Sequence, residues 1–345
     1  MKKILAILMC AVMAMTITAC SSGNEIPYSK SDKDKSTSDK ADKDRDNNDD
    51  DYDDNDDNDG SFDEEPNDDN DDFSEPEPGK TYDNLSEWIT DGFRFVPMLD
   101  KTGYRITHYT LDDPNIVIPS ECDGVPVRAI EGLGSYSGVT SITIPNSIVA
   151  INGLGGQPNL TSIDIPNSVT TIGDSAFAGC TGLTSITIPK KVTTIGDSAF
   201  SGCTSLTSID IPKSVTAIGG DAFYDTPWLE NKRSETPLVI VNNVVVDGRT
   251  CEGSVTIPDG ITAISGSSFK FCDKLTNVTI PDGVTSIGRY AFTDCSSLKN
   301  ITLPDSMTEI DTNAFSACYN TQVTYKGNTY DFAHINDLYK AINGN

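Results

Sequence analysis

The sequence predicts a mainly β fold, a solenoid in which turns of about 23 residues stack on one another. Proline recurs with a 23-residue step in two series: Pro166, Pro189 and Pro212, then Pro258, Pro281 and Pro304. The 46 residues from Pro212 to Pro258 make two full periods, so an interruption there keeps the register. Self-similarity at a fixed period of this length is typical of stacked repeat architectures.

The apolar pattern within each turn also predicts a solenoid. Leu183, Ile186 and Ile188 have the L-x-x-I-x-I spacing of a leucine-rich repeat strand. Side chains alternate along a strand, so Ile186 and Ile188 face the core while Ser185 and Thr187 face solvent. One turn cannot bury its apolar side chains alone, and stacking places each of them on its equivalent in the next turn. We therefore expect a parallel sheet on one face, a short strand near 192–195 on another, and little helix.

The complete repeat motif resembles that of a known family. I-x-I-P-x-x-V-x-x-I-G-x-x-A-F-x-x-C-x-x-L recurs with few changes in turns that begin at Ile163, Ile186, Ile209, Val255, Val278 and Ile301. Over residues 102–345 it resembles the BspA-like leucine-rich repeat family of bacterial surface proteins. The resemblance implies adhesion to host proteins or to other cells. One turn departs: Pro145 and Pro166 are 21 residues apart, and Gly153-Leu154 replaces Gly-x-x-Ala-Phe, so we expect that turn to be tighter on its convex side.

Residues 1–19 have the form of an export signal. Two lysines precede an almost uninterrupted apolar run over residues 4–15, which is too short to span a bilayer permanently. The run leads into Ile17-Thr-Ala-Cys20, which looks like a bacterial lipobox. We therefore expect cleavage before Cys20, a lipid on that cysteine and a membrane-anchored location at the cell surface. The alternative is an ordinary secretory signal with a chance cysteine.

Residues 20–79 are predicted to be that lipidated cysteine and a disordered acidic tether. Between positions 21 and 78 there are 24 Asp and Glu residues against six Lys and Arg residues, a net charge of −18. Such a segment cannot bury enough apolar surface to offset its chain entropy. Residues 55–60 match the start of an EF-hand calcium loop, but Pro66 stands where the bidentate Glu is required. We expect a chance match and no specific metal site.

Caps are predicted at both ends of the repeats, which span residues 140–320. The N-terminal cap and irregular first repeat, 80–139, contain two strand patterns around the turn signal that ends at Gly103. The C-terminal cap, 321–345, contains a hairpin pattern and then a helix whose apolar stripe is Ile335, Leu338, Tyr339 and Ile342. Terminal repeats are atypical because one side of each meets water.

An insertion at 224–254 interrupts the repeats. Its first part predicts a short helix that begins at Pro227, and its second part predicts two strands about an Asn-Asn turn. Trp228 and Tyr224 are the large aromatic residues here. They could form a binding tip, but we favour a structural role in which Trp228 fills the convex side of the solenoid.

The cysteines predict a buried ladder rather than disulfides or a metal site. Five of them hold the same repeat position: Cys180, Cys203, Cys272, Cys295 and Cys318. Stacked side chains at one repeat position have parallel Cβ directions, which disfavours a disulfide between them. With Cys122 and Cys251 we predict seven free thiols in the folded part. No C-x-x-C pair or histidine pair is present, so we expect neither a metal site nor a cofactor.

No catalytic constellation is apparent, so we expect no enzyme and assign no catalytic residue. The two histidines, His108 and His334, lie in opposite caps, where a Ser-His-Asp or Cys-His arrangement cannot assemble. Residues 79–345 carry 28 acidic and 17 basic residues, a net charge of −11. Such a surface repels nucleic acid and anionic lipid, so nucleic acid is not an expected partner.

The candidate ligand face is the solvent-facing side of the predicted sheet. One repeat position carries Thr143, Asp164, Thr187, Asp210, Thr256, Thr279 and Thr302, and beside it run Ser141, Ser162, Ser185, Ser208, Ser254, Asn277 and Asn300. We expect one flat ladder with rungs about 4.8 Å apart. Small hydroxyls and amides suit extended polar recognition but lack the Tyr, Trp and Arg of tight hot spots. The Asp rungs argue against an ice-binding surface.

Two functions follow from these observations. The first is a surface-anchored, non-enzymatic protein that mediates adhesion or protein recognition through the solenoid. The alternative is a polysaccharide-binding or wall-spacing structural lipoprotein. The expected partners are an extracellular protein or glycan and, through the lipid on Cys20, the membrane. The fold itself does not name the ligand.

Overall fold

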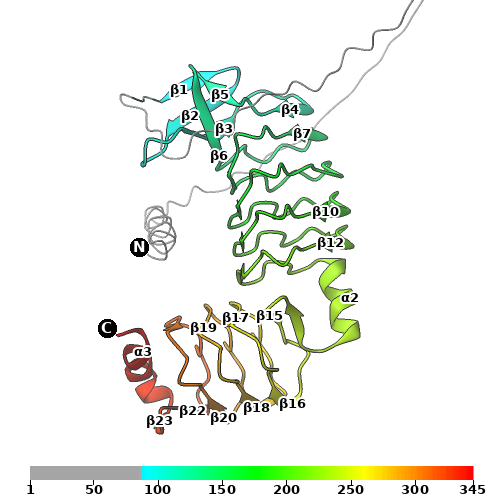
Figure 1. Ribbon diagram of the computed structural model, residues 1–345. Helices are drawn as coiled ribbons and strands as arrows, with labels where there is room; N and C mark the ends of the chain where they lie inside the picture. Colours follow the sequence, from blue (N-terminus) through cyan, green and yellow to red (C-terminus); the bar gives the residue numbers. More distant parts are fainter. Residues whose placement is uncertain (1–84, 86, 345) are drawn as a thin grey trace, which may run out of the picture. The chain divides into compact units, whose positions relative to one another are not determined.

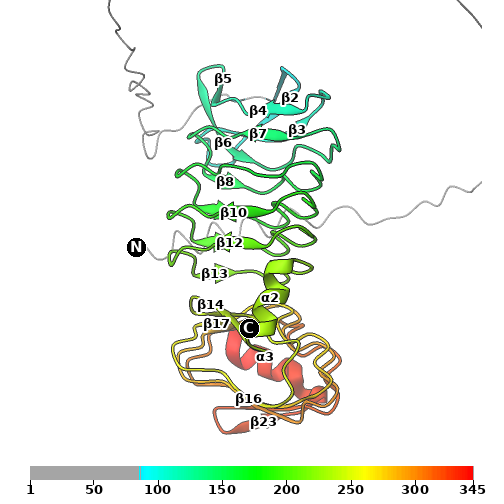
Figure 2. The same ribbon diagram turned by 90° about the vertical axis from the view of Figure 1, so that its right-hand side faces the viewer.

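The computed structural model describes residues 85 and 87–344, and the predicted signal, Cys20 and the acidic tether lie outside them. The described residues form a solenoid of stacked turns with parallel strands on two faces and a cap at each end (Figures 1 and 2). This confirms the predicted mainly β, leucine-rich repeat class. In this part of the chain, no helix has the length and apolar character needed to cross a membrane.

The N-terminal cap is an antiparallel sheet that passes into the first parallel turns. It consists of β1 (Trp88–Thr90), β2 (Phe93–Pro97), β3 (Tyr104–Tyr109), β5 (Glu121–Cys122) and β6 (Val125–Ile130). The β2–β3 pairing confirms the hairpin predicted before Gly103. β3 then pairs in parallel with β6, and the solenoid begins there. β1 was not predicted, because its three side chains are all exposed and give no alternating pattern.

A sheet of short strands follows one face of the N-terminal stack, residues 85–223. After β6 it contains β8 (Ala150–Ile151), β9 (Thr171–Ile172), β11 (Thr194–Ile195) and β13 (Ala217–Ile218). All pair in parallel, with one isoleucine of each strand opposite that of the next. β11 confirms the short strand predicted near 192–195. Each turn of the repeat therefore contributes one strand to this sheet.

The other face carries the strands that display the predicted ligand residues, and we call it the ladder face. In the N-terminal stack β4 (Asn115–Val117) pairs with β7 (Ser141–Thr143), and β10 (Ser185–Thr187) pairs with β12 (Ser208–Asp210). Both pairs are parallel and in register. Between β7 and β10, the turn that carries Asp164 contains no strand on this face. The ladder face thus already has a break in this stack.

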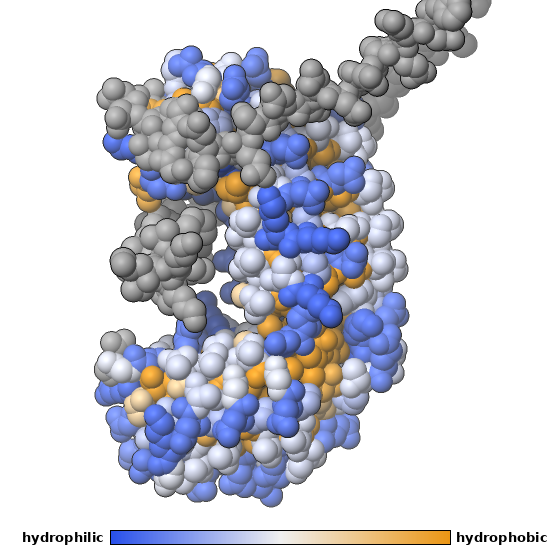
Figure 3. Space-filling model, in the orientation of Figure 1, coloured by the Kyte–Doolittle hydropathy of each residue, from blue (hydrophilic) through white to orange (hydrophobic). Residues whose placement is uncertain are grey.

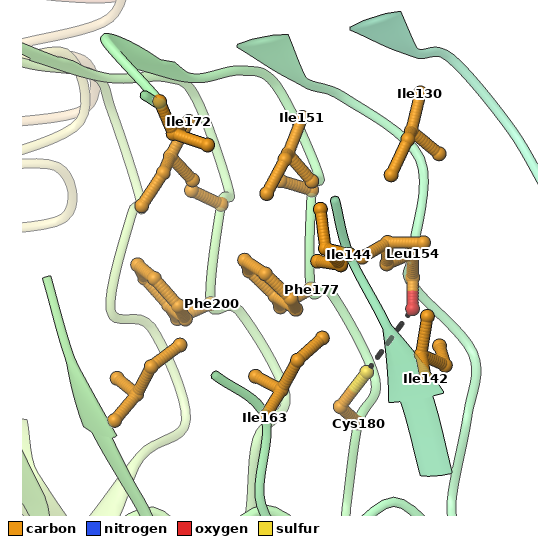
Figure 4. Close-up of a cluster of buried hydrophobic side chains, with 14 of the residues drawn as sticks. Ile130, Ile142, Ile144, Ile151, Leu154, Ile163, Ile172, Phe177, Cys180 and Phe200 are labelled. Carbon is orange, nitrogen blue, oxygen red and sulfur yellow. Dashed lines mark hydrogen bonds between the residues drawn. The ribbon is translucent and has the colours of Figure 1, made fainter. Parts of the chain in front are cut away.

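Two rows of apolar side chains fill the N-terminal stack (Figure 4). One contains Ile130, Ile151 and Ile172, and the other contains Leu154, Phe177 and Phe200. The ring of Phe200 stacks on those of Phe177 and Phe223, with centroids 5.4 and 5.9 Å away. Leu154 takes the place of phenylalanine in the 21-residue turn and is fully buried. The shortened turn therefore keeps its place in the stack.

The insertion forms the predicted helix and hairpin. These are α2 (Pro227–Glu235), β14 (Val239–Val241) and β15 (Val244–Asp247). Thr226 caps the helix by accepting a hydrogen bond from the Leu229 amide at 3.2 Å. Trp228 is buried, and its ring lies 4.7 Å from that of Phe223 at an angle of 53°, so it ends the row of stacked phenylalanines. The interpretation we favoured for Trp228, a packing role, is confirmed.

The turns on either side of the insertion meet on one edge only. On the edge away from the ladder face, Gly220 approaches Gly266 so closely that a Cβ would lie 2.9 Å from the Gly266 carbonyl carbon. Beside it, the Ser265 hydroxyl donates to the Ile218 carbonyl oxygen at 2.6 Å. On the ladder face, β12 and β16 (Gly253–Thr256) belong to different sheets. Contact on one edge and extra chain on the other change the stacking direction at this point (Figure 1).

A buried ion cluster connects the insertion to the N-terminal stack. Asp247, at the end of β15, has a side chain that is 1% exposed. Arg233 of α2 donates two hydrogen bonds to its carboxylate, at 2.9 and 2.7 Å, and these bonds raise the pKa of Arg233. The Arg249 amide donates to the same carboxylate at 3.3 Å, while its guanidinium pairs with Asp221. Asp247 is therefore the shared anion of two arginines.

The C-terminal stack, residues 244–344, begins with the second strand of the insertion and has two uninterrupted sheets. The short-strand sheet runs from β15 through β17 (Ala263–Ile264), β19 (Ser286–Ile287) and β21 (Glu309–Ile310). The ladder face runs from β16 through β18 (Leu275–Thr279), β20 (Asn300–Thr302), β22 (Gln322–Tyr325) and β23 (Asn328–Tyr330). Phe269, Phe292 and Phe315 form a second stacked row, with centroids 5.0 and 5.4 Å apart. The repeat motif therefore builds the same core on both sides of the insertion.

The C-terminal cap closes the open end of this stack. It consists of the predicted β22–β23 hairpin, a 3₁₀ turn η1 (Phe332–His334) and helix α3 (Ile335–Asn343). α3 buries Leu338, Tyr339 and Ile342 of the predicted stripe, and Gly344 ends it with a φ of 75°. The Asn343 side chain accepts from the Ile310 amide at 3.0 Å and donates to the Ile310 carbonyl at 2.8 Å. It therefore satisfies backbone groups at the open edge of β21.

The histidine of this cap gives a prediction for pH dependence. Asp331 accepts hydrogen bonds from the His334 amide at 3.1 Å and from its Nδ1 at 2.6 Å, and these bonds raise the pKa of His334 above its ordinary value. A raised histidine pKa stabilises the fold below the unfolded value, and the contribution is lost as pH rises through the folded value. In an NMR titration, Asp331→Asn should lower the pKa of His334. An unchanged midpoint would contradict this account.

All seven described cysteines are free and buried, as predicted. The ladder thiols donate to carbonyl oxygens of the preceding turn. The sulfur of Cys203 lies 3.1 Å from the Phe177 oxygen, that of Cys295 lies 3.0 Å from the Phe269 oxygen, and that of Cys318 lies 2.7 Å from the Phe292 oxygen. Cysteine at this position therefore fills apolar space and also satisfies a buried acceptor.

All seven thiols are shielded from solvent, and burial raises the pKa of several of them, which is directly testable. Burial raises the pKa of Cys203 to about 12 and that of Cys251 to about 11, so both stay protonated at neutral pH. Because the thiolate is the reactive form, a chain that lacks residues 1–20 should react slowly with a disulfide reagent at pH 8. In denaturant all seven thiols should react. Fast modification of the folded chain, or five or fewer thiols in denaturant, would contradict this prediction.

Candidate functional site

The predicted ligand residues lie on the ladder face with their side chains in solvent. Thr143, Asp164, Thr187, Asp210, Thr256, Thr279 and Thr302 are all exposed, and the apolar residue before each lies against the core. None of these seven side chains forms a hydrogen bond or ion pair with another residue that the structure describes. Their hydroxyl and carboxylate groups are therefore available to a ligand.

Another set of threonines at the same period has a structural role instead. The Thr285 hydroxyl donates to the Thr262 carbonyl oxygen at 3.2 Å, and the Thr308 hydroxyl donates to the Thr285 carbonyl oxygen at 3.2 Å. These hydroxyls satisfy backbone acceptors of the preceding turn. The contrast separates ladder threonines, which have no protein partner within the described chain, from threonines that bond one turn to the next.

At the neighbouring repeat position on the ladder face, some side chains form hydrogen bonds with their equivalents in the adjacent turn. The Asn277 amide donates to the Ser254 hydroxyl at 3.0 Å, and the Asn300 amide donates to the Asn277 side-chain oxygen at 3.4 Å. At the N-terminal end, Ser141 donates to the Asn115 side chain at 2.7 Å. These bonds hold the amide groups in place beside the threonines. A ligand would meet a row of free hydroxyls next to a row of fixed amides.

The expectation of one continuous ladder is wrong, because the ladder face is divided into separate sheets. Thr143 lies in the β4–β7 pair, and Thr187 lies beside Asp210 in the β10–β12 pair. Asp164 lies between these pairs in a turn without a strand. Thr256, Thr279 and Thr302 share the sheet after the insertion, where they pair in register. The insertion therefore separates an Asp-containing part from a threonine part.

The threonine part is longer by one rung than the repeat motif predicted. Thr324 of β22 pairs with Thr302, and its hydroxyl lies 3.5 Å from that of Thr329. Sequence analysis missed it because it lies in the cap, beyond the last proline of the repeat. The Val323-Thr-Tyr325 pattern, which alternates like the Ile-x-Ile of the repeat strands directly after the last turn, was the available signal.

The described residues do not bring the remaining chemical groups together. His108 is exposed in the N-terminal cap, and His334 is exposed beside Asp331 in the other cap. No group of three or more His, Cys, Asp or Glu side chains within residues 85 and 87–344 is placed to hold a metal ion. An open hollow beside α3 is lined by Thr308, Asp311 and Asn343, which are polar groups of the repeat and the cap. The extended ladder face is thus the surface on which a function can be built.

The visible surface is largely hydrophilic (Figure 3). Apolar side chains gather near the β14–β15 hairpin, where Ile240 and Val241 are partly buried. This apolar area lies at the insertion, between the two stacks.

Comparisons with known proteins agree with this architecture. The family model of the BspA type leucine rich repeat region matches six copies, over residues 132–244 and 249–334, which is more than half of the chain. No curated protein matches at a significant level.

Solved structures of bacterial leucine-rich repeat proteins are similar to the chain. A leucine rich cell surface protein from Faecalibacterium prausnitzii is 23% identical, with 70% of this chain and 89% of that chain covered and a TM-score of 0.29. A leucine rich repeat protein from T. pallidum is 22% identical, with coverages of 65% and 81% and a TM-score of 0.23. The pneumococcal vaccine antigen PcpA is 18% identical, with coverages of 69% and 75% and a TM-score of 0.34. By the repeat motif and the extent of the family match, the chain belongs to the BspA-type leucine-rich repeat family.

Proposed function

We propose that the chain is a non-enzymatic recognition protein of the bacterial cell surface, which binds an extracellular protein through its ladder face. The observation that carries this proposal is the set of seven exposed ladder side chains without a partner among the described residues. The solenoid holds them in a fixed array, so little conformational freedom is lost on binding. Hydroxyls and two isolated carboxylates, Asp164 and Asp210, can match backbone and basic groups of a protein.

The cell-surface location rests on the N-terminal sequence. The apolar run over residues 4–15 and the lipobox-like Ile17-Thr-Ala-Cys20 support export followed by lipid attachment at Cys20. The acidic segment at 20–79 would then separate the solenoid from the membrane. Metabolic labelling with palmitate tests this step, with Cys20→Ser as the control. Labelling should be lost in the variant, and absence of label in the parent would overturn the lipoprotein assignment.

A binding panel tests the recognition function. The soluble form, residues 20–345 with Cys20→Ser, would be presented at physiological salt to fibronectin, fibrinogen and a glycan array. We expect saturable binding to a protein, with modest affinity because the ladder lacks aromatic and arginine anchors. Several copies on one cell would strengthen attachment through avidity.

The carboxylates provide the sharpest variants for this panel. Asp164→Asn and Asp210→Asn keep the size and exposure of the side chains but remove their charge. Loss of protein binding in the double variant would support specific recognition by the ladder face. Binding to glycans alone would replace this proposal with a polysaccharide-binding role, and no binding to any panel member would favour a spacer.

A further inference from the structure

Along one edge of the C-terminal stack, several residues differ from those at the same repeat positions in other turns, and packing of the core does not explain these differences. Phe271 stands where equivalent turns have Gly179 and Gly202, and Tyr290 stands where they have Ser175. The adjoining positions change as well. Lys270 takes the place of Ala178 and Ser201, and Arg289 takes the place of Asp174 and Asp197. Four large aromatic or basic side chains thus replace small or acidic ones on two neighbouring turns.

Backbone conformation makes two of these replacements costly. The positions of Phe271 and Tyr290 are left-handed, with φ values of 64° and 59°, and the equivalent Gly202 and Ser198 have φ values of 72° and 55°. A bulky residue in this region is a strained outlier, whereas glycine adopts it freely. Phe271 is also 60% exposed, so burial of its ring does not offset the strain. Strain kept without a gain in packing is typical of functional positions.

The two aromatic rings hold two cationic groups in place. The Lys270 ammonium lies 4.9 Å from the centre of the Phe271 ring and 5.8 Å from that of Tyr290. The Arg289 guanidinium lies 4.7 Å from the Tyr290 ring and donates to its hydroxyl at 3.0 Å. Neither cation forms a direct ion pair with a residue of the described chain, although Arg289 lies near enough to Asp197 for its charge to oppose the rise that burial causes in the pKa of that carboxyl. Their heads are therefore oriented but still available to carboxylates.

Two carboxylates adjoin the exposed ring. The Asp273 amide donates to the Phe271 carbonyl oxygen at 2.9 Å, so Asp273 follows it in the same tight turn. Asp294 has the repeat position of Phe271 in the next turn, where the Phe271 amide donates to the carbonyl of Thr293 at 2.9 Å. Both Asp side chains are exposed, and neither forms an ion pair within the described residues. The aromatic patch is the set Lys270, Phe271, Asp273, Arg289, Tyr290 and Asp294.

We propose that the aromatic patch is the surface through which two copies of this chain associate about a two-fold axis. In such a contact each patch meets the same patch, so it must be complementary to itself. The patch meets this condition because it presents two cations and two carboxylates that are not paired with each other. Cations of one copy can face carboxylates of the other while the exposed Phe271 ring and the half-buried Tyr290 ring pack at the centre. A partner of one charge sign would satisfy only half of these groups.

The composition and size of the patch predict a weak dimer. Aromatic residues and arginine are enriched in the cores of protein interfaces. Six residues cover less than the roughly 800 Å² per partner of a standard stable interface, so association in solution should be reversible and weak. Attachment to one membrane would raise the effective concentration of the copies. The proposal goes beyond the ladder-face function and does not depend on it, because the patch precedes the ladder strands in each turn.

Sedimentation equilibrium of the soluble form, residues 20–345 with Cys20→Ser, tests the proposal with substitutions taken from the chain itself. At physiological salt and concentrations of about 0.01–1 mM, we expect a monomer–dimer equilibrium. Phe271→Gly and Tyr290→Ser install the residues of equivalent turns, so neither should lower the melting temperature, and each should weaken the dimer about tenfold or more. A chain that is monomeric throughout, or a dimer that both variants leave unchanged, would overturn the proposal.

Charge reversal tests the two-fold arrangement without assuming which residues pair. Variant one carries Lys270→Glu and Arg289→Glu, and variant two carries Asp273→Lys and Asp294→Lys. Each alone should be monomeric, because like charges face each other, and a mixture should form a one-to-one dimer tighter than the parent. Lys190→Glu with Lys213→Glu is the matched control and should dimerise like the parent. A mixture that stays monomeric would rule out the self-complementary contact.

Discussion

Replacing Asp247 with alanine is expected to lower the free energy of unfolding by about 3–5 kcal/mol, which is the usual cost of breaking a buried ion pair from one side. The carboxylate is 1% exposed and receives two hydrogen bonds from Arg233, whose side chain is 14% exposed. Arg249 also lies 3.5 Å from it. Without Asp247 two guanidinium groups would stay in a poorly hydrated site without their shared anion.

The position of Asp247 predicts how the protein would unfold as well as how much stability it would lose. The residue lies at the point where the apolar cores of the two stacks meet. Stability of a repeat array depends on contacts between neighbours, so a weakened junction should uncouple the stacks. Trp228 is buried at this junction and, once Trp88 of β1 is replaced with Phe in all variants, reports on it by fluorescence, while circular dichroism reports on all turns. In Asp247→Ala the two urea transitions should separate.

Glu252→Ala provides the matched control for this prediction. Glu252 also pairs with a basic residue, Lys274, but their side chains are 62% and 72% exposed. Exposed pairs contribute about 0–1 kcal/mol, so this variant should unfold like the parent. If Asp247→Ala proved as mild as Glu252→Ala, the ion cluster would not hold the junction together.

Phe200→Ala is expected to cost about 3–5 kcal/mol, because it removes a fully buried aromatic ring from a close-packed row. The Phe200 ring is parallel to those of Phe177 and Phe223, with interplanar angles of 6° and 4°. The substitution would open a cavity between two turns, and identical turns on both sides cannot move together without breaking register. Urea unfolding followed by circular dichroism measures the effect.

Phe332→Ala serves as the control for the buried phenylalanine. Phe332 is 38% exposed in the C-terminal cap and makes an edge contact with Tyr319, at a centroid distance of 4.8 Å. Removing it should cost about 1 kcal/mol or less, because little apolar surface is lost and no closed cavity forms. Equal losses in the two variants would mean that the stacked row does not carry the stability of the turn.

Local sequence signals predicted the elements that local chemistry determines. The turn before Gly103 marked the N-terminal hairpin, and the stripe from Ile335 to Ile342 marked α3, because spacing along the chain alone sets these patterns. The repeat itself predicted the core, since each apolar position packs on its own equivalent. The burial of the ladder cysteines was predicted in the same way, because they share one repeat position.

The features that sequence analysis missed depend on contacts between distant residues. The main break in the ladder face, between β12 and β16, lies opposite the edge where Gly220 meets Gly266. The 46 residues from Pro212 to Pro258, which make two full periods, had suggested continuity there. The Asp247 cluster joins residues from α2, β15 and the turn of Asp221, which no short motif brings together. The strain at Phe271 was also hidden, because a left-handed position is not visible in a repeat motif until the backbone is known.

The division of the ladder face changes how a ligand could be bound. The threonine part lies on one sheet, whereas the Asp-containing part consists of two separate strand pairs and the strandless turn of Asp164, so the face offers short arrays rather than one long one. The threonine part presents Thr256, Thr279 and Thr302 in register, with Thr324 as a fourth rung. A ligand that needs both parts must therefore bridge the insertion.

Binding by two triple variants tests the central claim, recognition through the ladder face, most directly. One variant replaces Thr256, Thr279 and Thr302 with lysine, and the other replaces Thr262, Thr285 and Thr308 with lysine. Both sets are exposed and have 23-residue spacing, and the second lies off the ladder face. For the fibronectin, fibrinogen or glycan that the parent binds, we predict about tenfold or greater loss in the first variant and parental affinity in the second. Equal affinities of the two variants, together with parental binding by the Asp164→Asn and Asp210→Asn double variant, would contradict recognition by the ladder face.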